Sequence, residues 1–276
     1  ERSLQKNTTA DNNVAVGFAA LSENTTGIRN TAVGTSALQT ITTANDSTAV
    51  GFEALKLATG TGNTAVGRDS GKSITSGSQN TVIGTAALDA LSTGARNTAV
   101  GGAALSTATT SSDNTALGYN TLLLTTTGTR NAAVGTYALD ANTTANDNTA
   151  IGFESLTSNT TGNQNTGAGS KTLGNNETGS NNAALGFFAL NANTTGSNNT
   201  AVGKSALDAN TTASNNTAVG QAALGANTTG TNNVAIGSLA LDANTTNSNS
   251  VAIGYRSLTN QTVADQNTAV GADSMF

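Results

Sequence analysis

The 276-residue sequence contains no cysteine, no proline, no histidine and no tryptophan. Without cysteine there is no disulfide framework and no thiol chemistry, although this composition is compatible with an extracellular protein. Aromatic residues make up 3% of the chain and charged residues 10%, which leaves little material for a deep globular core. The 11 basic residues are scattered singly and the formal charge is -5, so no basic stripe follows a nucleic-acid backbone. We therefore expect no nucleic-acid partner.

Long apolar runs are also missing, and no stretch is long or apolar enough to insert into a bilayer. Enzyme sites need converging titratable groups, yet the acids fall singly at variable places, such as Glu53 and Glu154. Asp89, Asp140, Asp208 and Asp242 share one position of the repeat described below, which we interpret as solvated surface. The sequence therefore predicts that the protein is not an enzyme and has no cofactor, metal site or catalytic residue.

What the sequence does contain is a repeat, which must be found before any local structure is assigned. A glycine closes a motif of the type NTAVG every seventeen residues, with one interval of sixteen between Gly51 and Gly67. These glycines are Gly17, Gly34, Gly51, Gly67, Gly84, Gly101, Gly118, Gly135, Gly152, Gly169, Gly186, Gly203, Gly220, Gly237, Gly254 and Gly271. We number each repeat from its glycine as position 0, so that Leu occupies position +4.

The periodicity predicts one continuous repeat array over residues 1–276. Ser3 and Leu4 fit positions +3 and +4 of a repeat whose glycine is missing, and Met275 takes the +4 position at the other end. The array is thus cut in mid-repeat at both ends. We expect a segment of a longer protein, or an assembly in which another chain covers each end.

Each repeat has the length of one turn of a β-solenoid, since helical repeats need more than thirty residues. The β-branched residues at -3 and -1 predict a short strand that ends at the glycine. A second extended piece is expected at +3 and +4, as at Ala206 and Leu207. The predicted fold is all-β: a parallel β-solenoid or β-roll of about sixteen turns, stacked about 4.8 Å apart into a rod.

Asparagine recurs at position -4, with Ser47 and Ser250 as the departures. Stacked amides can hydrogen-bond to the turns above and below, so we predict a structural asparagine ladder. Its members are Asn13, Asn30, Asn63, Asn80, Asn97, Asn114, Asn131, Asn148, Asn165, Asn182, Asn199, Asn216, Asn233 and Asn267.

Positions -2 and -1 are both apolar, although neighbouring strand residues point to opposite faces. We expect Val, Ile or Leu at -1 to pack inside the coil against the Leu column at +4. The alanines at -2 would then face outward and let three copies approach about a common axis as a homotrimer. Alternatively, a bend at -2 turns both residues inward in a flattened coil. The predicted trimer-interface column is Ala15, Ala32, Ala49, Ala65, Ala99, Ala116, Ala133, Ala150, Ala184, Ala201, Ala218, Ala235, Ala252 and Ala269.

The motifs NTAVG, NVAIG and SVAIG resemble the head repeats of trimeric autotransporter (YadA-like) adhesins, whose period is shorter. In motif and period together, the chain more closely resembles the NTAxGxxAL…NTTG arrays of phage and virus tail-fibre proteins. This resemblance implies a trimeric fibre shaft or head, located on a virion or cell surface outside the cell, that carries attachment to a host. The chaperone domain that often follows such arrays is not visible.

Position +1 holds six of the nine aromatic residues: Phe18, Phe52, Tyr119, Phe153, Phe187 and Tyr255. They are candidates for packing at a corner or between subunits, or for an exposed platform that binds a host glycan or protein. Eight NTT runs, which begin at Asn7, Asn24, Asn142, Asn159, Asn193, Asn210, Asn227 and Asn244, fit the glycan-acceptor pattern. We interpret these asparagines as turn residues.

The leading functional hypothesis is a structural or adhesive fibre segment that provides reach, stiffness and multivalent attachment. The alternative is an ice-binding β-solenoid, because Thr recurs at -3, +8 and +9. Adjacent threonines at +8 and +9 would, however, face opposite sides of an extended chain. A polysaccharide-cleaving tailspike would need an acidic pair in a groove, which the repeat does not display.

Overall fold

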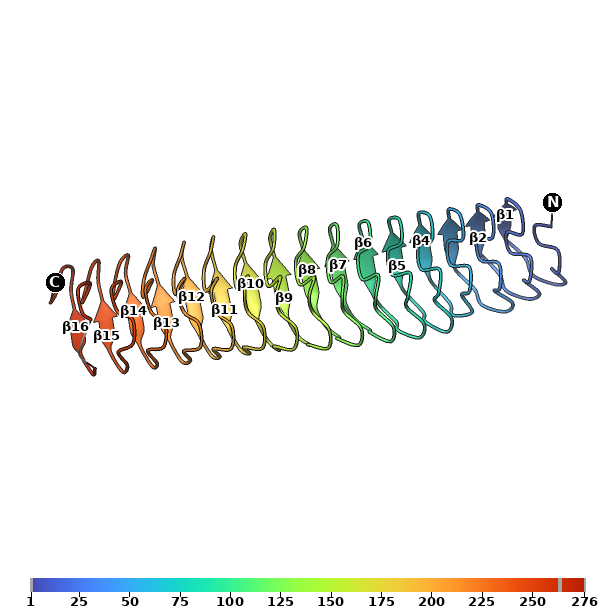
Figure 1. Ribbon diagram of the computed structural model, residues 1–276. Coiled ribbons are helices and arrows are strands. Elements are labelled where there is room, and N and C mark those ends of the chain that lie inside the picture. Colours follow the sequence, from blue (N-terminus) through green and yellow to red (C-terminus); the bar gives the residue numbers. More distant parts are fainter. Residues whose placement is uncertain (1, 263–264, 276) are drawn as a thin grey trace. The chain divides into compact units, whose positions relative to one another are not determined.

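The computed structural model describes residues 2–262 and 265–275, in which each repeat contributes one short β-strand (Figure 1). The chain folds as two compact units, Glu1–Thr144 and Ala145–Phe276. Unit 1 contains β1 (Val14–Val16), β2 (Thr31–Val33), β3 (Thr48–Val50), β4 (Thr64–Val66), β5 (Thr81–Ile83), β6 (Thr98–Val100), β7 (Thr115–Leu117) and β8 (Ala132–Val134). Unit 2 contains β9 (Thr149–Ile151), β10 (Thr166–Ala168), β11 (Ala183–Leu185), β12 (Thr200–Val202), β13 (Thr217–Val219), β14 (Val234–Ile236), β15 (Val251–Ile253) and β16 (Thr268–Val270).

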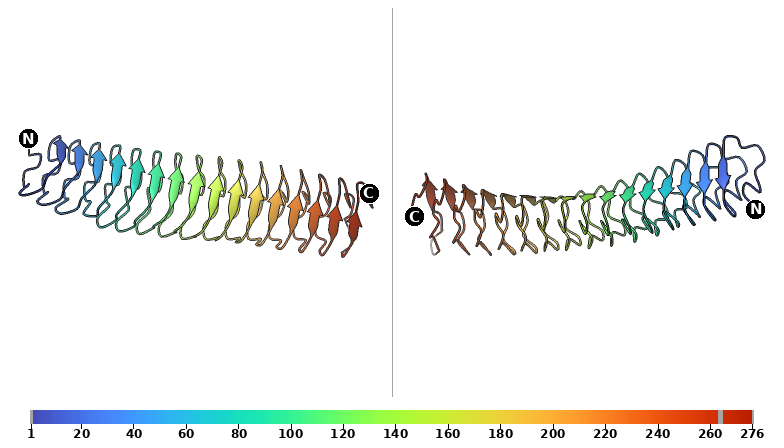
Figure 2. Two further views of the ribbon diagram at one scale, coloured as in Figure 1. Left: turned by 180° about the vertical axis from the view of Figure 1, so that it is seen from behind. Right: turned by 90° about the horizontal axis from the view of Figure 1, so that it is seen from above.

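Within each unit the strands pair in parallel and in chain order, one turn after another (Figure 2). The register matches equivalent repeat positions: Ala201 lies beside Ala218, and Val202 beside Val219. The short repeat keeps this register, since Ala49 lies beside Ala65. The predicted all-β parallel solenoid with one repeat per turn is confirmed.

The interior of each turn is narrow and is filled by Ala at -2, Ala or Ser at +3 and Leu at +4. The prediction that the -2 alanines face outward was therefore wrong. Ala201 is 0% exposed, whereas its neighbour Val202 is 37% exposed. Leu at +4 enters the coil from the opposite wall, and this leaves room for only a small side chain from the strand. The buried alanines of the predicted interface are Ala32, Ala49, Ala65, Ala99, Ala116, Ala133, Ala150, Ala184, Ala201, Ala218, Ala235, Ala252 and Ala269, while Ala15 is half-buried.

Positions +3 and +4 do not form the predicted second extended piece. Residues at +2 and +4 have left-handed backbone conformations, for example Ser205 with φ 54° and Leu207 with φ 52°. Because a left-handed residue breaks the alternation of an extended chain, Ala206 and Leu207 both point inward. The flattened coil with both -2 and -1 inside is also wrong, because the alternation holds in the strand and turns -1 outward.

The glycine at position 0 is required by both conformation and space. Gly203 has φ 133°, and a Cβ atom there would lie 2.5 Å from the carbonyl oxygen of Gly220 in the next turn. Only glycine accepts this backbone and this approach without strain. The close approach of the turns thus depends on one glycine per turn.

The asparagine ladder at -4 is confirmed, and its members are buried except Asn13 and Asn267, which are partly exposed. Asn182 Nδ2 donates to Asn165 Oδ1 at 3.2 Å, and Asn182 Oδ1 accepts hydrogen bonds from the backbone N–H and the Nδ2 of Asn199. Each amide also binds across the coil, since Asn182 Nδ2 donates to the carbonyl of Gly196 at 2.9 Å. The side chains therefore satisfy buried backbone groups as well as one another.

A second amide ladder lies at +7, where the sequence suggested only turn residues. In unit 2, Asn193 Nδ2 donates to Asn176 Oδ1 at 2.7 Å and to the carbonyl of Gly196 at 2.9 Å. The two ladders thus meet on the same carbonyl. In unit 1 the +7 position is largely apolar, with Ile41, Ile74 and Leu91 all buried. The two units accordingly have differently filled interiors.

Candidate functional site

The surface of interest is the outer side of the sheet, where positions -3, -1 and +1 point away from the coil. The parallel hydrogen-bond ladder continues past each strand: Gly203 N–H donates to Leu185 O at 2.8 Å and Ser205 N–H to Phe187 O at 3.0 Å. The alternation of the strand therefore extends to +1. We call these three columns, together with the exposed column at -5 that borders them before the strand, the outward sheet face.

The central column of the outward sheet face is apolar in every turn. Position -1 holds Val, Ile or Leu, with Ala168 as the exception. Most of these side chains are exposed: Val16, Val33, Val50, Val66, Ile83 and Leu117 in unit 1, and Ile151, Leu185, Val202, Val219, Ile236, Ile253 and Val270 in unit 2. Neither the -3 nor the -1 column contains a charged residue. A repeated apolar column of this kind is uncommon on the surface of a monomer, which makes it the candidate interaction surface of this chain.

The six predicted aromatic residues lie at the +1 edge of this face, and all are about half exposed. Phe18, Phe52 and Tyr119 belong to unit 1, and Phe153, Phe187 and Tyr255 to unit 2. Phe187 meets the ring of Phe188 at +2, with 4.4 Å between ring centroids, and the guanidinium groups of Arg2 and Arg256 lie 6.0 Å and 5.9 Å from the ring centroids of Phe18 and Tyr255. None of the six side chains is buried in the interior, so all six remain candidates for contact with a partner.

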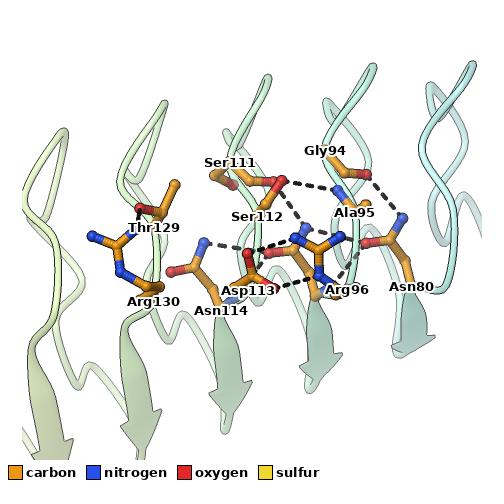
Figure 3. A network of polar contacts seen from close by, with 11 residues as sticks. Asn80, Gly94, Ala95, Arg96, Ser111, Ser112, Asp113, Asn114, Thr129 and Arg130 are labelled. Carbon is orange, nitrogen blue, oxygen red and sulfur yellow. Dashed lines mark hydrogen bonds and ion pairs between the residues drawn. The ribbon is translucent and has the colours of Figure 1, made fainter.

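The opposite edge of the outward sheet face is the column at -5, where exposed charged and polar residues lie (Figure 3). Arg96 Nε pairs with Asp113 Oδ1 in the next turn at 2.6 Å, and Arg29 pairs with Asp46 in the same way. The hydrogen bond from Arg96 holds the pKa of the Asp113 carboxyl below its ordinary value. Opposite charges thus lie in neighbouring turns where the column is charged, while the column is uncharged from Gln164 to Gln266.

Several charges outside this column also pair within the chain. Around the short repeat, Glu53 binds Lys56 at 2.6 Å and Lys72, and Lys72 also lies 3.5 Å from Asp69. The hydrogen bonds from Lys56 and Lys72 lower the pKa of Glu53. Among the described residues, no group of three or more His, Cys, Asp or Glu side chains is arranged to hold a metal ion.

The acids at +5 are half-buried on the side of the coil away from the outward sheet face. Burial raises the pKa of Asp89, Asp208 and Asp242 above the ordinary value. The prediction that these acids are solvated surface residues was therefore only partly right, because the neighbouring turns desolvate their carboxyl groups.

Replacing Asp208 with Asn, the residue found at the same position in Asn191, is expected to stabilise unit 2 at neutral pH. When folding raises the pKa of a carboxyl group, that group lowers the free energy of unfolding as the pH rises from its pKa in the unfolded chain to its pKa in the folded chain. Above the pKa of the folded chain this loss stays constant. The gain from D208N should appear across this window and remain at pH 7, with a size below about 1 kcal/mol because water still screens the group. Thermal unfolding from pH 3 to 8 measures it, with Asp242→Asn expected to act in the same direction. Equal or lower stability of D208N at pH 7 would contradict the assignment.

The NTT asparagines are poor glycan acceptors in the folded chain. Seven of the eight are buried, and the Nδ2 of Asn210, for example, donates to Asn193 Oδ1 and to Ala213 O. The exception, Asn7, is exposed. The threonines at +8 also form hydrogen bonds within the chain: Thr211 Oγ1 donates to Thr228 O at 3.2 Å. The fixed position of NTT within each repeat is the sequence feature that could have indicated that these asparagines and threonines bond to neighbouring turns.

Comparison with known proteins assigns no family to the chain. No protein-family model matches the sequence, and no curated protein matches it. In the described part of the chain no helix has the length and apolar character needed to span a membrane. The chemistry of the outward sheet face is therefore the basis for a functional proposal.

Proposed function

We propose that the chain is a structural or adhesive segment of a fibre that assembles from several copies of itself, with a homotrimer as the expected form. The apolar column at -1 of the outward sheet face carries this proposal. It repeats in both units, contains no charge, and stays exposed in the isolated chain. Because every copy presents the same column with the same spacing, another copy is a matched partner for it.

The role we propose is mechanical and non-enzymatic. Turns joined by backbone ladders and buried amides form a stiff support, and repeated identical surfaces provide multivalent display. In keeping with the resemblance of the repeats to fibre arrays, we propose that the protein acts outside the cell, on a virion or cell surface. Exposed aromatic residues such as Phe153 and Tyr255 are candidates for contact between copies or with a host glycan or protein.

The proposal predicts that Val202→Lys together with Val219→Lys converts the assembly to single chains while each chain stays folded. The ammonium groups of both lysines would have to lose their hydration in an apolar contact, and this costs far more free energy than the contact contributes. Light scattering of the purified chain gives the mass, and three times 27.1 kDa is expected for the unmodified protein.

Matched controls are Thr212→Lys and Thr229→Lys, which place the same charges at exposed positions outside the outward sheet face. They should leave the mass unchanged, and circular dichroism should be alike for both pairs. A single-chain mass for the unmodified protein at all accessible concentrations would overturn the proposal.

The second candidate is ice binding, favoured by the threonines at -3 in β2 to β7 of unit 1. They lie on the outward sheet face next to the valine column, and the stacked methyl and hydroxyl groups repeat about every 4.8 Å. Thr at +8 no longer supports this reading, because those hydroxyls bind the next turn. A single-chain protein that inhibits ice recrystallisation would favour this candidate over the fibre.

A further inference from the structure

The two edges of the outward sheet face vary together in size. Position -5 forms one edge and position +1 the other, and both are largely exposed. Six turns have a long side chain, Arg or Gln, at -5, and all six have a small residue at +1. These pairs are Arg29 and Thr35, Gln79 and Thr85, Arg96 and Gly102, Arg130 and Thr136, Gln164 and Ser170, and Gln266 and Ala272.

The other ten turns have a short residue, Asn, Asp or Gly, at -5, and nine of them have a large residue at +1. These nine pairs are Asn12 and Phe18, Asp46 and Phe52, Gly62 and Arg68, Asp113 and Tyr119, Asp147 and Phe153, Asn181 and Phe187, Asn198 and Lys204, Asn215 and Gln221, and Asn249 and Tyr255. The exception is the turn with Asn232 and Ser238, where both are small. Size is matched even where the residue types differ, as in Gly62 with Arg68.

This matching cannot arise from contact within one chain. Positions -5 and +1 of a turn are six residues apart, on opposite sides of the three-residue strand, and even with the left-handed backbone at -5 their Cα atoms are on the order of 15–20 Å apart. Their actual neighbours lie in the next turn near the same edge: Arg96 binds Asp113 at -5, and Tyr119 meets Tyr137 at +2 with ring centroids 5.9 Å apart. The contact that matches the sizes must therefore come from another molecule.

We propose that copies of this chain associate in parallel and in register, so that the +1 edge of one copy packs against the -5 edge of its neighbour in the same turn. This inference rests on the proposed self-association. It adds which residues are in contact between copies and that the copies run in the same direction. A long side chain on one edge fills the space that a small residue leaves on the other, which keeps the total volume at each level nearly constant.

The same-turn pairing also restricts the symmetry. A rotation axis parallel to the stacking direction brings equal turns of different copies to the same level. A two-fold axis perpendicular to that direction would pair early turns with late ones, and a stagger would pair each turn with a shifted one. The size matching within single turns therefore favours closed cyclic assembly, in which each copy uses both edges.

The decisive variant is Thr85→Phe in unit 1, where Gln79 occupies the -5 position. Two large side chains would then meet, and association should weaken at least about tenfold because the contact is overpacked. Adding Gln79→Asn, the size found opposite most aromatic residues, should restore association to within about threefold. Residue 79 cannot touch residue 85 in its own chain, so such a rescue must act through another copy.

Ser238→Phe is the matched control, since Asn232 already leaves space opposite that position. It should leave association unchanged or strengthen it. The measurement is sedimentation equilibrium over a concentration series, with circular dichroism to show that all variants are folded. Equal weakening by T85F and S238F, or failure of Q79N to rescue T85F, would overturn the edge pairing even though the protein self-associates. An unmodified protein that stays single would overturn the pairing together with the proposed function.

Discussion

Gly203→Ala is expected to destabilise unit 2 by about 3 kcal/mol or more. The backbone at this residue has φ 133°, a conformation that alanine adopts only with strain. Its Cβ would also lie 2.5 Å from the Gly220 carbonyl oxygen, a backbone atom that cannot rotate away. Adjacent turns would have to separate, which breaks the ladder on both sides. Thermal or urea-induced unfolding followed by circular dichroism measures the loss.

The matched control is Gly225→Ala, in the following turn. Its backbone does not require a positive φ, and the nearest atom to its new Cβ is a side-chain oxygen of Asp242 at 2.9 Å, which can move. The same position carries larger residues in other turns, including Asp208. We expect a change within about 0.5 kcal/mol for G225A. Equal effects of the two substitutions would show that glycine at position 0 does not control the stacking.

Asn182→Ala is expected to cost about 2–4 kcal/mol, the second large effect. Asn182 is buried, and its loss leaves the backbone N–H of Asn199 without its acceptor. The carbonyl of Gly196 keeps one donor, Asn193, so the damage is limited to one side of the coil. Unfolding of unit 2 reports the change, and Asn182→Ser should cost less because Ser250 occupies the same position in another turn.

Asn175→Ala provides the control for amide removal in the preceding turn. Asn175 is exposed at +6, where alanine stands in other turns, for example at Ala192 and Ala209. Its replacement should change stability by no more than about 0.5 kcal/mol. A loss for N182A as small as that for N175A would mean that the buried ladder contributes little.

The period, the strand before each glycine and the amide ladder at -4 could be predicted from sequence because each depends on neighbours one repeat away. The sequence did not predict which side of the strand faces the interior of the coil. Ala201 and Val202 are both apolar, so local alternation does not tell which of them lies inside. The answer depends on Leu207, which comes from the opposite wall and occupies most of the interior.

The prediction of an extended segment after each glycine was wrong for a different reason. Left-handed residues are usually recognised by glycine or asparagine, yet here leucine takes this conformation at +4, as at Leu207. Stacked identical turns impose this backbone through their hydrogen bonds, which no single repeat reveals. Likewise, the ladder at +7 was missed because Asn193 within NTT has the sequence pattern of an ordinary turn.

The amide ladders also give each turn a direction. In both columns the Nδ2 group donates to the Oδ1 of the earlier turn, as from Asn182 to Asn165 and from Asn193 to Asn176. The side-chain dipoles therefore add along the stack and polarise one another, as peptide dipoles do in a helix. Each new turn meets a surface that is already oriented to receive its amides, so a folded turn serves as the template for the next. Growth of the array by duplication of a repeat then requires no new contact to evolve.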